Sequence, residues 1–163
     1  MRYWLFKSEP TTFGIDHLVK CPRQTEPWNG VRNYQARNML RDEIKVGDKG
    51  FFDHSSCVPP GIVGMIEVVR SGYADHTAFD PGSPYYDADS TPDKPRWYMV
   101  DVKLIEKFPR MITLEEIKSN SKLKDMVVTR QGSRLSITPV TANEWKVICA
   151  KYRYITSIKP ILY

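Results

Sequence analysis

Short strand-like segments are joined by short helical ones along the chain, and this arrangement most constrains the fold. Apolar runs and alternating patterns predict strands over residues 2–8, 50–54, 62–69, 97–107 and 134–140. Helices are expected at 12–19 and about 33–43, and capping-box patterns that begin at Thr113 and Thr141 each predict another short helix. Strands and helices do not alternate in the regular way of a parallel α/β sheet. The segments therefore predict a small α+β barrel.

The size and charge of the chain narrow the possibilities further. At 163 residues the chain is expected to form a single domain, residues 1–163, around one core. Hydrophobic residues make up 41% of the sequence and charged residues 26%, as in an ordinary globular protein. The net charge of +5 favours an anionic partner such as nucleic acid. A slightly basic surface with no such partner explains the charge equally well.

Cysteine usage and the start of the chain indicate the compartment. The three cysteines, Cys21, Cys57 and Cys149, are widely spaced and include no CxxC pair. This pattern argues against a disulfide framework and a structural zinc site, and it favours a reducing environment. The apolar run in MRYWLFKSEP is too short for a signal peptide, and no window reaches the length of a membrane span. We therefore expect a cytoplasmic protein with no metal and no membrane association.

The segment Trp28–Arg41 combines side chains that suit a flat, hydrogen-bonding ligand. Its sequence, WNGVRNYQARNMLR, concentrates aromatic rings, amides and guanidinium groups. Surface helices normally use Glu and Lys, because amide side chains add no charge and compete with the backbone for hydrogen bonds. This composition predicts a nucleobase site. The structural alternative is a helix capped by Asn33, with core-facing residues Val31, Tyr34, Met39 and Leu40.

Motifs spread over nearly the whole chain, to about residue 150, resemble the EVE domain family in order and spacing. They are KSEP (7–10), WNGVRNYQAR (28–37), HS (54–55), PGIVG (60–64), AFDP (78–81), RWYMVDV (96–102) and RLSITPV (134–140). The resemblance implies a PUA-like fold, a distorted β-barrel of about five to seven strands with short peripheral helices. It also implies a non-enzymatic domain that reads a modified nucleobase, flipped out or single-stranded, in DNA or RNA.

This sequence departs from the family pattern in two places. Asp53 stands where the family often has an aromatic residue before the His-Ser pair. Residues 151–163, KYRYITSIKPILY, are expected to form a C-terminal extension past the usual end of the domain. The first departure bears on the detailed shape of the binding pocket.

A base-binding pocket requires a stacking wall and polar groups that face the edge of the base. Trp28 and Trp97 are the candidate walls, with Phe52 and Tyr34 in support, and stacking is worth about 1–3 kcal/mol per base. Each of these aromatic residues could instead belong to the core. The polar candidates are Ser8, Asn33, His54, Ser55 and Ser136.

Three arginines complete the predicted site: Arg32, Arg37 and Arg134. They are expected to hold phosphate or contact a base, because a planar guanidinium both donates hydrogen bonds and stacks. Surface ion pairs are the alternative role for each of them. The predicted partner is nucleic acid that carries a modified base.

An enzyme acting on a modified nucleoside or nucleotide, with His54 as acid or base, is the alternative function. Cys57 follows His54 closely and suggests a Cys–His nucleophile, but no oxyanion motif accompanies the pair. Binding is therefore the better interpretation. We expect no catalytic residue, no cofactor and a monomeric protein.

Overall fold

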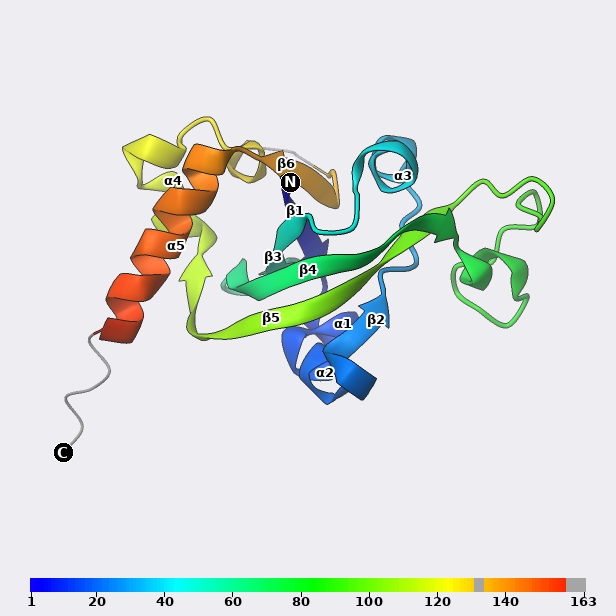
Figure 1. Ribbon diagram of the computed structural model, residues 1–163, viewed down its shortest axis with the longest axis horizontal. Coiled ribbons are helices and arrows are strands. Elements are labelled where there is room, and N and C mark those ends of the chain that lie inside the picture. Colours follow the sequence, from blue (N-terminus) through cyan, green and yellow to red (C-terminus); the bar gives the residue numbers. More distant parts are fainter. Residues whose placement is uncertain (131–133, 158–163) are drawn as a thin grey trace.

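The computed structural model describes residues 1–130 and 134–157, with side chains up to Lys151. Its main element is a six-stranded sheet with the order β2-β5-β4-β3-β1-β6 (Figure 1). The strands are β1 Tyr3–Ser8, β2 Thr25–Pro27, β3 Lys49–His54, β4 Gly61–Ala74, β5 Tyr98–Thr113 and β6 Ile137–Val140. The α-helices are α1 Pro10–Phe13, α2 Ile15–Lys20, α3 Tyr34–Asn38, α4 Leu114–Lys118 and α5 Ala142–Ser157. Shorter helical turns lie at Pro22–Gln24, Met39–Glu43, His76–Phe79, Ser121–Leu123 and Val127–Thr129.

The strand pairing confirms the α+β class and the expected number of strands. β1 and β3 are parallel, and the other neighbouring pairs are antiparallel. β2 and β6 are the two edge strands, and within the described residues they do not pair with each other. The expected distorted β-barrel is therefore a curved sheet that the described strands do not close. The parallel pairing places Ser8 beside His54 and Lys7 beside Asp53 at one end of the sheet.

β4 and β5 are longer than their hydrophobic patterns predict. They span 14 and 16 residues, and Figure 1 shows them side by side along the length of the molecule. Their register shifts at several points, including Ile62/Gly64 and Val68/Arg70. Such bulges add local twist and let a long pair follow a curved core, so strand pairing continues where simple alternation fails. At the far end β4 and β5 are joined by a long loop, residues 75–97, which contains Tyr85.

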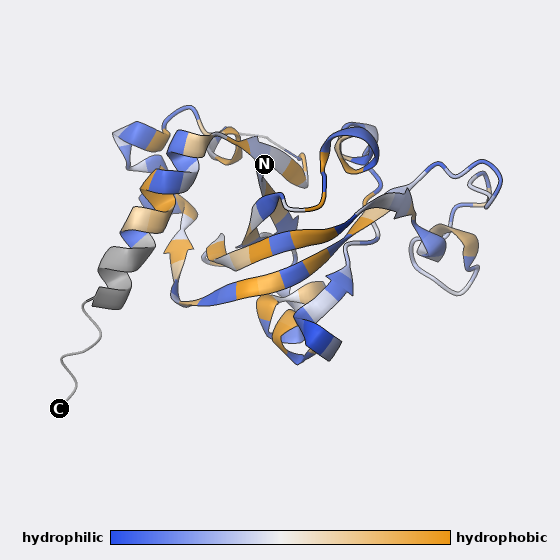
Figure 2. Ribbon diagram, in the orientation of Figure 1, coloured by the Kyte–Doolittle hydropathy of each residue, from blue (hydrophilic) through white to orange (hydrophobic). Residues whose placement is uncertain are grey.

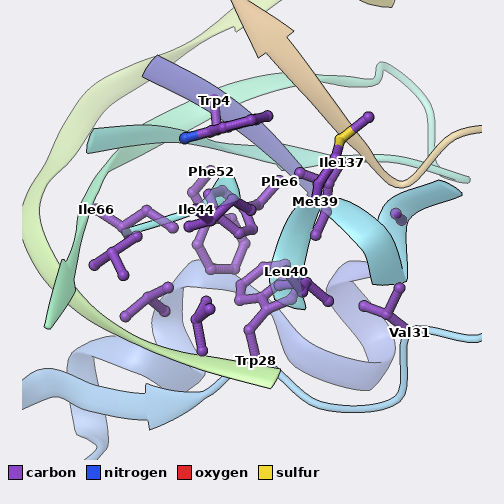
Figure 3. Packing of buried hydrophobic residues seen from close by; sticks show 14 of the residues in the cluster. Trp4, Phe6, Trp28, Val31, Met39, Leu40, Ile44, Phe52, Ile66 and Ile137 are labelled. Carbon is purple, nitrogen blue, oxygen red and sulfur yellow. The ribbon is translucent and has the colours of Figure 1, made fainter. Parts of the chain in front are cut away.

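The sheet carries a hydrophobic core on each face, because side chains alternate along every strand. In β1, Phe6 belongs to one cluster and Leu5 to the other. Figure 3 shows Trp28 and Phe52 in the cluster that contains Phe6. Met39 and Leu40, from the helical segment after Asn33, belong to the same cluster. Orange and blue stretches follow one another along β4 and β5 in Figure 2. The single core expected from chain length is thus divided in two by the sheet.

Local capping patterns predicted three helix starts correctly, although α5, with 16 residues, is longer than the short helix that was expected after Thr141. Oδ1 of Asn33 accepts a hydrogen bond from the Ala36 N–H at 3.0 Å, and α3 continues through one π-helical turn, Met39–Glu43. The box that begins at Thr113 opens α4, and the box that begins at Thr141 opens α5. The helix expected at 12–19 is divided into α1 and α2. The segment expected to be a loop, 22–30, contains the short strand β2, which pairs with β5.

The C-terminal helix bears on the expected extension. α5 runs without interruption from Ala142 to Ser157, so the first residues of the 151–163 segment continue a helix of the domain. Residues 158–163 lie outside the described part of the chain. None of the described helices is long and apolar enough to cross a membrane.

Candidate functional site

One cavity lies where β1 ends and is bounded by α1, α2 and the segment that leads into α3. Its volume is about 730 Å³. We call it the Trp28 pocket. Its lining residues are Lys7–Glu9, Thr12, Phe13, His17, Cys21, Glu26–Asn33, Tyr85 and Ser136.

Trp28 and Phe13 form the aromatic wall of this pocket. The Trp28 backbone N–H donates to the Val100 carbonyl at 2.7 Å, which fixes the segment against β5. Its indole packs edge-on against Phe6 and Phe52, with ring centroids 5.2 and 5.3 Å away. Phe13 lies nearly parallel to it, at 6.1 Å and 27°. Trp28 is only 8% exposed, so it serves both the core and the pocket.

Three of the predicted polar residues lie on the Trp28 pocket: Ser8, Asn33 and Ser136. The Ser8 hydroxyl donates to the Phe13 carbonyl at 2.6 Å, which leaves its oxygen able to accept from a ligand. Asn33 uses Oδ1 to cap α3, so its NH₂ group can still donate to a ligand. The structural alternative for Asn33 is therefore confirmed, and it is compatible with a second role at the pocket.

Arg32 also lines the pocket, but its hydrogen bonds are directed into the protein. Its guanidinium donates to the Val31 and Tyr85 carbonyls, to Asp75 and to the Thr77 hydroxyl. These contacts occupy all the N–H groups that an arginine side chain has. Its faces are bordered by the Tyr85 and Trp97 rings, at 5.6 and 5.2 Å. Arg32 thus fixes the loop that carries Tyr85, and its charge is paired with the carboxylate of Asp75.

Asp75 is the buried partner of this arrangement. Its carboxylate accepts hydrogen bonds from the Gly30 N–H at 2.8 Å and from Arg32 at 3.0 Å. Burial would raise the pKa of Asp75, but hydrogen bonds from Thr77, Gly30 and Arg32 outweigh it and hold the pKa below its usual value. The ionised Asp75 therefore joins the pocket segment to the long loop.

Tyr34, Phe52 and Trp97, which were candidates for the stacking wall, lie elsewhere. Phe52 is fully buried and supports Trp28 from behind. Trp97 is 6% exposed, and its indole N–H donates to Asp87 at 2.7 Å. Tyr34 stacks on Trp97 at the surface, with ring centroids 5.0 Å apart. Phe52 and Trp97 therefore match the core alternative, whereas Tyr34, which was expected to face the pocket or the core, is 53% exposed.

His54 does not reach the Trp28 pocket. Its Nε2 accepts a hydrogen bond from the Ile15 N–H at 3.1 Å, at the first residue of α2. Burial lowers the pKa of His54, which favours the neutral imidazole that this contact requires. The histidine thus joins β3 to α2.

The remaining predicted residues lie on a second cavity or on the surface. This cavity, about 570 Å³ in volume, is called the Asp53 recess. It shares Lys7–Glu9 and Ser136 with the Trp28 pocket, and its other lining residues are Asp53, Ser55, Ser56, Pro60, Leu114, Val128 and Arg134. Arg37 lies over the Tyr34 ring at 4.9 Å and donates to the Arg96 carbonyl.

Several pocket residues were not predicted from the sequence, notably Lys7, Phe13, Asn29 and Tyr85. Lys7 adjoins Ser8, and Asn29 adjoins Trp28, so proximity to a predicted residue was an available signal. Tyr85 lies in the loop between β4 and β5, where Tyr86 follows it. No sequence signal places Phe13 beside Trp28.

Within the described residues, no group of acidic, histidine and cysteine side chains is arranged to hold a metal ion.

Comparison with known proteins connects this geometry to a family. The EVE domain matches residues 2–151. Thymocyte nuclear protein 1 of Mus musculus is 44% identical over 164 residues, covering 90% of this chain and 71% of that protein. A Pseudomonas putida protein of known structure is 47% identical, with a TM-score of 0.87 over 92% of this chain and 99% of the other. Human THYN1, solved in complex with DNA containing 5-methylcytosine, is 42% identical, with a TM-score of 0.86 over 93% and 98% of the two chains. Since the match runs from β1 into α5 and includes every segment that lines the Trp28 pocket, the chain belongs to the EVE domain family.

Proposed function

We propose that this protein binds nucleic acid and reads a modified nucleobase, flipped out of its stack or single-stranded, in the Trp28 pocket. The composition of the pocket carries the proposal. An aromatic wall and convergent hydroxyl, amide and amino groups line one cavity of about 730 Å³. Small-ligand sites have this size and this combination of an apolar lining with a few polar groups.

5-Methylcytosine in DNA is the first ligand to test, because the solved human THYN1 complex contains it. A base in the pocket would stack on Trp28 or Phe13, a contact worth about 1–3 kcal/mol. Its edge would meet Ser8 and Asn33, which offer an acceptor and a donor. Burial of the extra methyl group would add about 0.8 kcal/mol, or about a fourfold preference over cytosine.

Phosphate contacts would contribute a modest and salt-sensitive share of the affinity. Lys7 lines the pocket and Arg134 lines the adjacent recess, while the N–H groups of Arg32 are already engaged. With a net charge of +5 and few cations at the site, the salt dependence should be shallow. Stacking and edge contacts would then carry the selectivity.

The proposal is tested by measuring dissociation constants for matched oligonucleotides. The set contains single-stranded and double-stranded DNA and RNA, each with cytosine or 5-methylcytosine at one position, and other modified bases follow. The wild-type protein should bind at least one methylated oligonucleotide severalfold more tightly than its plain counterpart. Equal affinity throughout a wider panel of modified bases would contradict the proposal.

Trp28→Phe and Trp145→Phe form a matched pair of variants for this assay. Both tryptophans are 8% exposed, but Trp145 packs in the other core, against Tyr3 and Phe51. Each variant removes a similar volume of buried indole, so both should lose some stability. Only Trp28→Phe should weaken binding and selectivity. An equal effect of the two variants would indicate that stability, and not stacking, controls the affinity.

Acid–base chemistry by His54 is not proposed. His54 lies outside the Trp28 pocket, and its Nε2 lone pair is engaged by the Ile15 N–H. A general base needs a free lone pair within reach of its substrate. Multiple turnover of a nucleotide by the purified protein, lost in His54→Gln, would overturn this assignment.

A further inference from the structure

The Asp53 recess and the Trp28 pocket lie on opposite faces of the sheet and meet at its end. Along β1, Ser8 follows the Phe6 face and Lys7 follows the Leu5 face, and these faces carry the two different cores. Asp53 is the register partner of Lys7 and shares its face. The shared lining residues form a ridge between the two cavities. A nucleic-acid strand that places one base in the Trp28 pocket therefore has a second cavity directly across the ridge.

Asp53 is a buried acid without a hydrogen-bond partner among the described residues. It is 5% exposed and lines the recess. Other buried acids are satisfied: Asp48 accepts from the Trp4 indole, Asp75 from Arg32, and Glu144 from the Thr141 N–H. Buried polar groups are nearly always hydrogen-bonded, so an unpaired carboxyl that borders a cavity points to a ligand. The register of β3 against β4 shifts at Asp53, and bulges of this kind redirect side chains at binding sites.

The surroundings of Asp53 determine which ligand suits it. Burial raises the pKa of Asp53 to about 7, while Lys7 opposes the rise. Glu9 and Arg134 line the same recess, and the negative charge of Asp53 raises the pKa of the nearby Cys57 thiol after the larger effect of burial. A neutral carboxyl both donates and accepts a hydrogen bond. It can therefore accept a hydrogen bond from the amino group of a nucleobase and donate one to the unprotonated ring nitrogen beside that amino group.

Adenine and cytosine present that edge, whereas thymine lacks the amino group. Leu114, Val128 and Pro60 also line the recess and give it apolar walls suited to a ring. A phosphate group is the weaker candidate, because Glu9 would repel it and Asp53 would repel it as well once that carboxyl ionises. Arg134 is exposed at the recess. Its guanidinium can balance the negative charge of the phosphate that joins the two bound nucleotides.

We propose that the Asp53 recess is a second base-binding subsite, in which Asp53 pairs with the amino edge of an adenine or cytosine next to the base in the Trp28 pocket. This inference rests on the proposed function. It gives the protein a preference for sequence context in addition to its preference for a modified base.

The test uses single-stranded oligonucleotides with one 5-methylcytosine and a thymine background. The base on each side of the 5-methylcytosine is varied in turn among adenine, cytosine, thymine and an abasic site. At about pH 6, where the Asp53 carboxyl is protonated, an adenine or cytosine on one side should bind about tenfold more tightly than thymine. At about pH 8 the preference should shrink, because a carboxylate cannot donate to the ring nitrogen.

Two substitutions make the test specific. Asp53→Asn keeps a donor and an acceptor without titrating, so it should retain a context preference of similar size at both pH values. Asp53→Leu should reduce that preference to less than about twofold while the preference for 5-methylcytosine over cytosine remains. Asp42→Asn, at an exposed acid that lines neither cavity, is the control and should behave as wild type.

The outcomes separate the two proposals. Selective binding of the methylated base with no effect of either neighbour would overturn the second subsite and leave the proposed function standing. A context preference that persists unchanged in Asp53→Leu would likewise overturn it. Loss of all discrimination between modified and plain bases in the wild type would overturn the proposed function as well.

Discussion

Gly30 and Tyr85 are in such close contact that a Cβ atom at Gly30 would lie 2.7 Å from Cζ of Tyr85. Gly30 also has a φ of +79°, a conformation that favours glycine. Two separate constraints therefore require glycine in the WNG sequence, and both fix one side of the Trp28 pocket. Tyr85 belongs to the long loop, so this contact also determines where the loop meets the pocket.

Gly30→Ala should lower the free energy of unfolding by more than about 1 kcal/mol and displace Tyr85, which should weaken oligonucleotide binding. Gly47→Ala is the matched control. Gly47 has a φ of +93°, but among the described residues only its chain neighbours would lie within 4 Å of a Cβ atom there. The Gly47→Ala variant should lose stability through backbone strain and keep the oligonucleotide affinity of the wild type. Urea unfolding and oligonucleotide binding measure the two effects. Equal loss of binding in both variants would contradict the role assigned to the Gly30–Tyr85 contact.

Asp75→Asn should destabilise the protein by about 3 kcal/mol, because it leaves the partly buried Arg32 guanidinium without its counter-ion. The pKa of Asp75 is lower in the folded protein, so its contribution is present above the unfolded pKa and is lost as pH falls through the folded value. The stability difference between wild type and Asp75→Asn should therefore shrink on acidification below about pH 4. Urea unfolding across this range measures it, and a difference independent of pH would contradict the assignment.

The contribution of Asp53 to the free energy of unfolding should change with pH in the opposite direction to that of Asp75. Its folded pKa, about 7, lies above the unfolded value, so the folded protein binds the proton more tightly and stability falls as pH rises from about 4 to 7. Asp53→Asn should then be more stable than wild type at about pH 8, by about 2–4 kcal/mol, and the gain should shrink towards pH 4. Urea unfolding at several pH values tests this. Greater stability of wild type at about pH 8 would show that an ionised Asp53 is satisfied in the folded protein.

Features set by neighbouring residues could be predicted from the sequence, whereas those set by distant contacts could not. The Asn33 cap and the Thr113 box depend on residues three positions away, and both were identified correctly. His54 was placed in the site because its motif suggested recognition, yet its partner Ile15 lies 39 positions away. Strand β2 contains only three residues and exists through pairing with β5, so its own sequence carries no strand pattern.

The same distinction applies to the candidate site. Ser8, Trp28, Asn33 and Ser136 were all predicted, and all four line one pocket, although their role in binding remains a proposal. Arg32 was chosen for its ability to hold phosphate, but a guanidinium can bind carbonyls and carboxylates of its own chain equally well. Only the fold determines which of these partners is within reach.

The most direct test of the central claim is an NMR titration that follows the indole N–H signals of the four tryptophans. The signals of Trp28 and Trp145 are assigned from their loss in Trp28→Phe and Trp145→Phe. Addition of a 5-methylcytosine oligonucleotide should shift the Trp28 signal in a saturable manner, with the same dissociation constant as the binding isotherm. The Trp145 signal, in the other core, should not move. Saturable binding of the oligonucleotide with an unchanged Trp28 signal would contradict the proposal that the base occupies the Trp28 pocket.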